Sequence, residues 1–160
     1  IKLDNLNKKI KVRVADHNDS EVIFDWRNDE LTRQMFRDSE KIEWYAHSKW
    51  LDTKLQNPNC CILMCYKDQA TDIGVVRFDI ENNYAELSLN LSPNERGKKL
   101  APICLSLAVN FFEKEYSSIN KLTAEIKTSN IASKKSFEKV GFKIDYEKDG
   151  YFHLSALINS

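Results

Sequence analysis

The chain has 160 residues, a length that fits one domain and suffices to bury a hydrophobic core without disulfides or metal ions. Its 24 basic and 24 acidic side chains balance, so the overall charge favours neither nucleic acid nor a membrane as a partner. No apolar run approaches the ~20 residues that cross a bilayer, and no signal peptide is evident. We therefore expect a single cytoplasmic domain over residues 1–160, with an upstream segment left open because the chain begins at Ile1.

The cysteines lie mostly in apolar runs and lack the two paired ligand clusters of a structural zinc site. They are Cys60, Cys61, Cys65 and Cys104. We expect buried, reduced thiols, as in a cytosolic protein, and no metal is implied.

The N-terminal third predicts one strand followed by two helices. The segment KKIKVRVA, residues 8–15, alternates apolar and charged side chains, and we expect the apolar ones, Val14 among them, to point inward. A first helix is expected to be capped by Asp19 or Ser20, and a second should run from about residue 42 to the Asn-Pro stop at residue 57.

The remainder predicts a strand meander, a buried helix and a second set of strands. Apolar or alternating runs predict antiparallel strands over residues 60–67, 73–81 and 84–92. The next segments predict a helix over 98–116, a strand from 121, a short helix ended by Gly141, and a hairpin that turns at Asp149-Gly150. The resulting element order is β α α β β β α β α β β.

The junction between the third meander strand and the following helix has the sequence Arg96-Gly97-Lys98-Lys99. A helix start offers unpaired backbone N–H groups and the positive end of the helix dipole. Three cations and a glycine, which lets a ligand approach the main chain, add to this. The junction suits a pyrophosphate, and a turn with ordinary surface charge is the alternative.

Two motifs resemble those of the GNAT superfamily of acetyl-CoA-dependent N-acetyltransferases. One is the run from Arg96 to Ala101, and the other is SNIASKKSFEKVGF, residues 129–142. With the element order, the resemblance covers about residues 10–158. It implies acetyl-CoA as cofactor and an α/β (α+β) GNAT fold with a mixed, largely antiparallel sheet and helices on both faces.

The resemblance also implies a cofactor site built from a strand end, the loop after it and a later helix. Its residues are Leu89, Asn90, Leu91, Arg96, Gly97, Lys98, Lys99, Leu100, Ala101, Asn130 and Phe137. The strand should separate from its neighbour near Asn90 and Leu91, so that its N–H groups hold the pantetheine arm and polarise the thioester carbonyl. Asn130 could also cap the following helix.

Two residues depart from the family pattern. Lys99 replaces the usual glycine, so its side chain could contact a phosphate or crowd the loop. Phe137 replaces the tyrosine that protonates the leaving thiolate in many members, and phenylalanine has no proton to give. Ser133, Ser136 or water could take that role, although either serine could equally be a capping or surface hydroxyl.

Acyl transfer to an amine requires a group that accepts the ammonium proton. Glu86 is the first candidate, because it lies on the polar register of the strand that leads into the loop, and Glu125 is the second. A solvated strand face is the alternative for both.

The N-terminal third suggests the acceptor. DWRND, residues 25–29, and IEWYAHSKW, residues 42–50, resemble the branch that acetylates the 4-amino group of UDP-linked amino-deoxy sugars. The implied substrate-binding residues are Arg27, Trp44, Tyr45 and His47. An aromatic stripe at helical spacing could instead belong to the core.

A small-molecule amine is therefore the expected partner, and the chain could form a homodimer. Two other functions stay open: acetylation of a protein amine such as a ribosomal-protein N-terminus, or a CoA-binding module with weakened catalysis.

Overall fold

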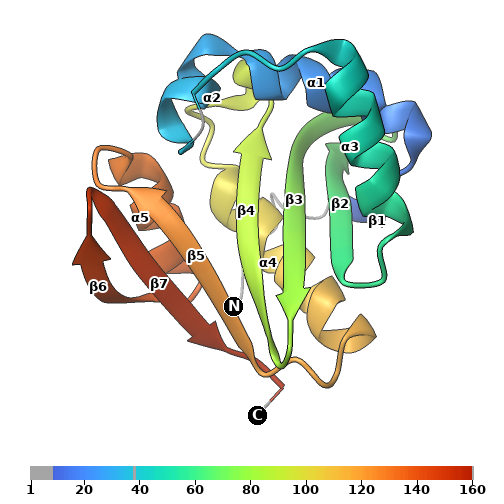
Figure 1. Cartoon of the computed structure of the whole chain (residues 1–160). Coiled ribbons are helices and arrows are strands. Elements are labelled where there is room, and N and C mark those ends of the chain that lie inside the picture. Colours follow the sequence, from blue (N-terminus) through green and yellow to red (C-terminus); the bar gives the residue numbers. More distant parts are fainter. Residues whose placement is uncertain (1–8, 38, 160) are drawn as a thin grey trace.

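A seven-stranded sheet organises the part of the chain that the computed structural model describes, residues 9–37 and 39–159 (Figure 1). The strands are β1 (Ile10–Val14), β2 (Cys60–Lys67), β3 (Thr71–Glu81), β4 (Tyr84–Leu91), β5 (Lys121–Lys127), β6 (Lys143–Lys148) and β7 (Tyr151–Leu157). Their order in the sheet is β1-β2-β3-β4-β5-β7-β6. Among the described strands only β4 and β5 pair in parallel, which confirms the mixed, largely antiparallel sheet and the predicted meander.

Helices cover both faces of this sheet, as expected. They are α1 (Ser20–Asn28), α2 (Glu30–Met35), α3 (Trp44–Gln56), α4 (Ala101–Glu115) and α5 (Ile131–Lys139), with short 3-10 turns η2 (His17–Asp19) and η3 (Pro93–Glu95). Helices α4 and α5 share the larger core, in which Phe78 of β3 stacks on Phe112 of α4 at 4.1 Å. Helices α1 and α3 pack on the opposite face around Trp26 and Leu51.

The continuous apolar run of β2 reflects burial on both faces, since its first six residues are all buried. All four cysteines are buried and free, as expected. Burial raises the pKa of Cys60 and of Cys61 to about 11, so these thiols stay protonated at neutral pH. No helix among the described residues is long and apolar enough to cross a bilayer.

The region between β1 and β2 holds three helices where two were predicted. Asp29 causes the extra break: its backbone ψ of 133° ends α1, and its carboxylate accepts a hydrogen bond from Thr32 N at 3.0 Å to cap α2. Val14 was also predicted to point inward, yet it is 57% exposed at the end of edge strand β1. The prediction for Val14 was wrong because alternation alone does not show where a neighbouring helix stops covering the strand.

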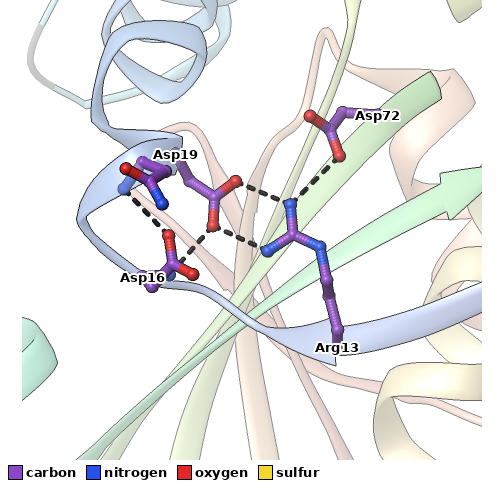
Figure 2. A network of polar contacts seen from close by, with 5 residues as sticks. Arg13, Asp16, Asp19 and Asp72 are labelled. Carbon is purple, nitrogen blue, oxygen red and sulfur yellow. Dashed lines mark hydrogen bonds and ion pairs between the residues drawn. The ribbon is translucent and has the colours of Figure 1, made fainter. Parts of the chain in front are cut away.

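Arg13 of β1 fastens the start of α1 to the sheet (Figure 2). Its guanidinium donates to both carboxylate oxygens of Asp19, at 2.8 and 2.7 Å, and lies 3.4 Å from Asp72. The Asp19 carboxylate also accepts from Asp16 N at 2.9 Å. Desolvation opposes ionisation of Asp19, but the Arg13 and Asp16 hydrogen bonds outweigh it, and the pKa of Asp19 is lowered. This ion pair fixes where α1 leaves the strand.

Arg13→Met should lower the free energy of unfolding by about 2 kcal/mol at neutral pH, because the buried Asp19 carboxylate loses its cation while Arg13 itself is partly solvated. Because the folded-state pKa of Asp19 is lowered, its stabilisation is present above the ordinary carboxyl pKa and disappears as the pH falls through the folded value. The difference in the free energy of unfolding between Arg13→Met and wild type should therefore become smaller at acidic pH.

Urea unfolding at neutral and acidic pH measures both effects. Lys11→Met removes an exposed charge from the same strand and serves as the control. Equal unfolding free energies for the two variants would contradict the assigned role of Arg13.

Candidate active site

The strands β4 and β5 separate partway along their length. Their pairing is limited to Tyr84–Lys121, Ala85–Leu122 and Glu86–Thr123, although β4 continues to Leu91 and β5 to Lys127. Figure 1 shows the two strands meeting near one end and diverging toward the other. The separation predicted near Asn90 and Leu91 is confirmed, and it leaves the β4 backbone beyond Glu86 without a β5 partner.

Glu86 lies at the point where the strands diverge. It faces the side covered by α1 to α3, because its neighbours Ala85 and Leu87 point into the α4 core. Desolvation by the surrounding protein, followed by the negative charges of Glu125 and Asp79, raises the pKa of Glu86 above its usual value. The Glu86 side chain is nonetheless exposed on this face of the sheet, and its raised pKa makes it a stronger base than an unperturbed glutamate.

The two neighbouring carboxylates are compensated. Asp79 accepts hydrogen bonds from Lys54 at 3.0 Å and from Arg77 at 2.9 Å. Glu125 of β5 accepts one from Arg37 Nε at 2.7 Å. Among the described residues no ion pair involves Glu86. Of the carboxylates of Asp79, Glu86 and Glu125, that of Glu86 can therefore accept a proton without breaking an ion pair of the described residues.

The loop between η3 and α4 has two residues in the left-handed region of φ. Gly97 has φ 75° and Lys99 has φ 61°, and Leu100 then returns to right-handed helical values. Lys99, which stands where the family pattern usually has glycine, thus adopts a φ that glycine accepts without strain. A left-handed residue followed by a right-handed one aims successive N–H groups into one concavity, next to the unpaired N–H groups of the first turn of α4. This arrangement fits the phosphates of the predicted cofactor.

The cations of the loop are mostly engaged within the protein. Arg96 pairs with Asp29 and donates to the Thr32 hydroxyl at 2.6 Å. Lys98 lies 3.3 Å from the buried carboxylate of Glu95. The hydrogen bond from Lys67, opposed by desolvation and assisted by Lys98, lowers the pKa of Glu95. Phosphate contacts by Arg96 and Lys98 stay predictions, since both side chains face internal carboxylates here.

Asp29 and Thr32 connect this loop with the diverging strand, and neither was singled out from the sequence. The Thr32 hydroxyl accepts from Arg96 and lies 3.4 Å from Asn90 Oδ1 on β4. Desolvation opposes ionisation of Asp29, but bonds from Arg96 and Thr32 prevail and lower its pKa. The sequence could have indicated Asp29 as a helix-capping residue, and this capping position is also where α1 ends and α2 begins.

The second motif forms the start of α5. The Asn130 side chain accepts from Ser133 N at 3.2 Å, so the capping alternative for Asn130 holds. Ser133 is half-buried in the first turn. Phe137 is only 2% exposed and packs edge to face on Phe142, with ring centroids 5.1 Å apart. Its ring lies in the main core in place of the expected cofactor surface.

The remaining predicted cofactor residues lie around the loop. They are the partly buried Leu89, Leu91 and Leu100, which pack against the main core, and Ala101, which begins α4. Their side chains support the core, so any contact with a cofactor would come mainly from their main chain.

The predicted acceptor residues do not gather in one pocket. His47 is fully buried: its Nε2 donates to Ser20 O at 2.8 Å, and its Nδ1 accepts from Arg27 at 3.0 Å. Arg27 also stacks on Trp50 at 4.1 Å. Burial, followed by the Arg27 charge, lowers the pKa of His47, which is therefore neutral. This interior position replaces the expected pocket lining.

Trp44 and Tyr45 behave differently from His47, since they are 48% and 78% exposed. A cavity of about 660 Å³ along α3 is lined by Tyr45 and Asp52, and another of about 430 Å³ is lined by Cys60 and Cys61. Neither is lined by Glu86 or by the loop at residues 96–101. Strand divergence, rather than an enclosed cavity, therefore defines the candidate site. The described part of the chain shows no cluster of potential metal ligands.

Residues 9–143 match the acetyltransferase (GNAT) domain family, so the chain belongs to this family. It is an acetyltransferase domain, and acetyl-CoA is its cofactor. A search of curated proteins finds no matching sequence.

Solved structures share the fold at low sequence identity. Spermidine N-acetyltransferase from Vibrio cholerae, in complex with CoA and spermine, has a TM-score of 0.81 at 14% identity, covering 94% of this chain and 96% of that one. A domain from Methanocaldococcus jannaschii has a TM-score of 0.80 at 22% identity, with 94% and 99% covered. The aminoglycoside acetyltransferase AAC(6')-Ib, in complex with ribostamycin and CoA, has a TM-score of 0.79 at 14% identity, with 94% of each chain covered.

Lys99→Gly should raise the free energy of unfolding by about 0.5 to 1 kcal/mol, because glycine adopts a φ of 61° without strain. The gain is reduced by the greater freedom of glycine in the unfolded chain. Acetyl-CoA affinity should stay within about twofold of wild type, since the backbone shape is unchanged.

Thermal unfolding without cofactor, together with calorimetric titration of acetyl-CoA, measures both quantities. Gly97→Ala is the matched reverse change: an added Cβ meets no atom within 4 Å, so it tests the φ of 75° alone and should be destabilising. A Lys99→Gly variant that is less stable than wild type would contradict the backbone strain assigned to Lys99. A tenfold loss of acetyl-CoA affinity would show that the Lys99 side chain contacts the cofactor.

Proposed function

We propose that this chain transfers the acetyl group of acetyl-CoA to the primary amine of a small cationic acceptor, with Glu86 receiving the ammonium proton. The observation that carries the proposal is the position of Glu86, where β4 and β5 diverge, with a raised pKa and no ion pair among the described residues. Acetyl-CoA supplies an activated thioester, and the protein supplies position, a base and hydrogen-bond donors.

The attacking nitrogen must be neutral before it can form a bond to the acetyl carbon. Ionised Glu86 would take the ammonium proton directly or through one water molecule. Backbone N–H groups of β4 beyond Glu86 have no β5 partner and would bind the pantetheine arm and the carbonyl oxygen. Base and donors thus lie on the same strand, a few residues apart.

The loop after η3 would hold the cofactor phosphates through its main chain. Gly97 has no atom within 4 Å of an ideal Cβ, so a phosphate can approach the backbone there. Lys99 is exposed at the same bend and could add a charge. The CoA and acetyl-CoA complexes of neighbours with this fold support this assignment.

Protonation of the leaving thiolate falls to Ser133 or to water, because the Phe137 ring has no exchangeable proton and lies in the core. Ser133 lies in the first turn of α5, where its backbone N–H donates to the Asn130 side chain and the residue is half-buried. A thiolate is a tolerable leaving group, so water suffices chemically.

Acidic side chains around the divergence favour a positively charged acceptor. Asp79 and Glu125 already have cationic partners, but their charges still act on Glu86, and a cation near Glu86 would stabilise its ionised form. The ligands named in the complexes of two neighbours, spermine and ribostamycin, are amine-rich cations of this kind. The UDP-linked amino sugar predicted from the sequence lacks such support, because Arg27 is committed to His47 and Trp50.

Glu86→Gln should lower kcat/KM for a primary amine by ~10² or more, because it keeps size and hydrogen bonding but removes basicity. Acetyl-CoA affinity should stay nearly unchanged. Product formation with butylamine, followed by mass spectrometry, measures the rate. Glu147→Gln on the exposed strand β6 is the control. A wild-type rate in Glu86→Gln would eliminate Glu86 as the base.

The pH profile offers a second test. Since the pKa of Glu86 is raised, the acid limb of kcat should lie above the ordinary glutamate pKa of about 4.3. Glu125→Gln removes a negative neighbour, so the Glu86 pKa should fall and the acid limb should move to lower pH. An acid limb that moves upward or stays fixed would show that Glu86 does not control it.

A further inference from the structure

An arginine of the chain itself lies against β5 and β7. Arg37, from the segment after α2, places Nε 2.7 Å and Nη2 2.5 Å from the same carboxylate oxygen of Glu125. Its Cζ atom also lies 4.0 Å from the ring centroid of Tyr151. A carboxylate and an aromatic face are the two groups with which proteins bind organic ammonium ions.

The binding groups belong to the sheet, whereas the cation belongs to a loop. Glu125 and Tyr151 lie on neighbouring strands that pair along their length, and the second Glu125 oxygen lies 3.8 Å from His153 Nδ1. The Arg37 side chain, in contrast, is 59% exposed. Exposed ion pairs are weak because both partners remain solvated. Arg37 can therefore leave while the carboxylate and the ring stay in place.

Departure of Arg37 would not detach its segment. Lys127 of β5 donates a hydrogen bond to Gln34 O at 2.6 Å, which ties the end of α2 to the same part of the sheet. The Lys127–Gln34 hydrogen bond therefore holds this segment without Arg37, and the Arg37–Glu125 contact is not required to keep the segment in place.

The site also lies at a useful distance from Glu86. Glu86 pairs with Thr123, and Glu125 lies two residues further along β5 on the same face. Two residues span about 7 Å along a strand and neighbouring strands lie about 4.8 Å apart, so the Cα atoms of Glu86 and Glu125 are at least about 8 Å apart. This separation suits the two nitrogens of a short aliphatic diamine.

We propose that Glu125 and Tyr151 form a subsite for a second ammonium group of the acceptor, and that Arg37 occupies this subsite until the acceptor displaces it. The inference rests on the proposed function, in which Glu86 receives the reacting amine. It assigns the acceptor to the diamines and polyamines, and it makes Arg37 a competitor that sets their affinity.

Calorimetric titration in the presence of CoA tests the exchange with 1,4-diaminobutane and with butylamine as a chain-length match. Wild type should bind the diamine more tightly. Arg37→Gln should tighten diamine binding by several-fold, up to about tenfold, and leave butylamine unchanged. Glu125→Gln should abolish the preference for the diamine. Arg37→Lys, which keeps the charge but loses the fork and ring contact, should fall between wild type and Arg37→Gln.

Lys41→Gln removes an exposed positive charge from the same inter-helix segment and controls for net charge. The proposal is overturned if Arg37→Gln leaves the diamine affinity unchanged or weakens it, if Lys41→Gln tightens it equally, or if Glu125→Gln keeps the diamine preference. Failure of the proposed function gives a different result: neither amine is acetylated with acetyl-CoA, whatever the binding preference.

Discussion

The early end of the β4–β5 pairing is the constraint on which the candidate site depends. An uninterrupted parallel ladder would pair the backbone N–H groups of β4 beyond Glu86 with β5 and leave none of them for a ligand. Because the ladder stops at Glu86–Thr123, main-chain donors of β4 and a carboxylate become available on adjacent residues.

Most charged side chains around this opening are paired with a side chain of opposite charge. Asp79, Glu95 and Glu125 each have a cationic partner, and Arg96 is held by Asp29. These ion pairs hold side chains that would otherwise move in solvent. Because each pair joins opposite charges, the pairs add nothing to the net charge. Glu86 differs because desolvation and repulsion from Glu125 and Asp79 outweigh the attraction of Arg77 and His153. Its basicity therefore depends on two strands, β3 and β5, that are far apart in the sequence.

Much of the fold could be predicted from local patterns, because alternation and apolar runs reflect burial directly. The apolar run CCILMCYK predicted one strand and the alternation before Ser92 predicted another, and the structure has both. The position of the strand separation followed from the family resemblance rather than from periodicity. The role of Lys99 became clear only from its backbone φ. The sequence shows that lysine replaces the usual glycine, but it does not show that the residue adopts a left-handed φ.

Side-chain roles that depend on distant partners could not be predicted in this way. His47 and Phe137 were aromatic residues at suitable spacing, and nothing in their own segments showed that their surroundings would bury them. The contacts between Arg96 and Asp29 and between Arg37 and Glu125 join residues 67 and 88 positions apart. Only the closed sheet and the helices above it bring such groups together.

Strand β6 has a consequence for the behaviour of the protein in concentrated solution. It forms one edge of the sheet, all six of its residues are exposed, and its register shifts between Ile144 and Tyr146. Such a bulge interrupts the row of hydrogen-bonding groups that another strand would use, and the charged residues Lys143, Asp145, Glu147 and Lys148 oppose close approach. This edge is therefore a poor template for fibrous aggregation, and a homodimer would have to use another surface.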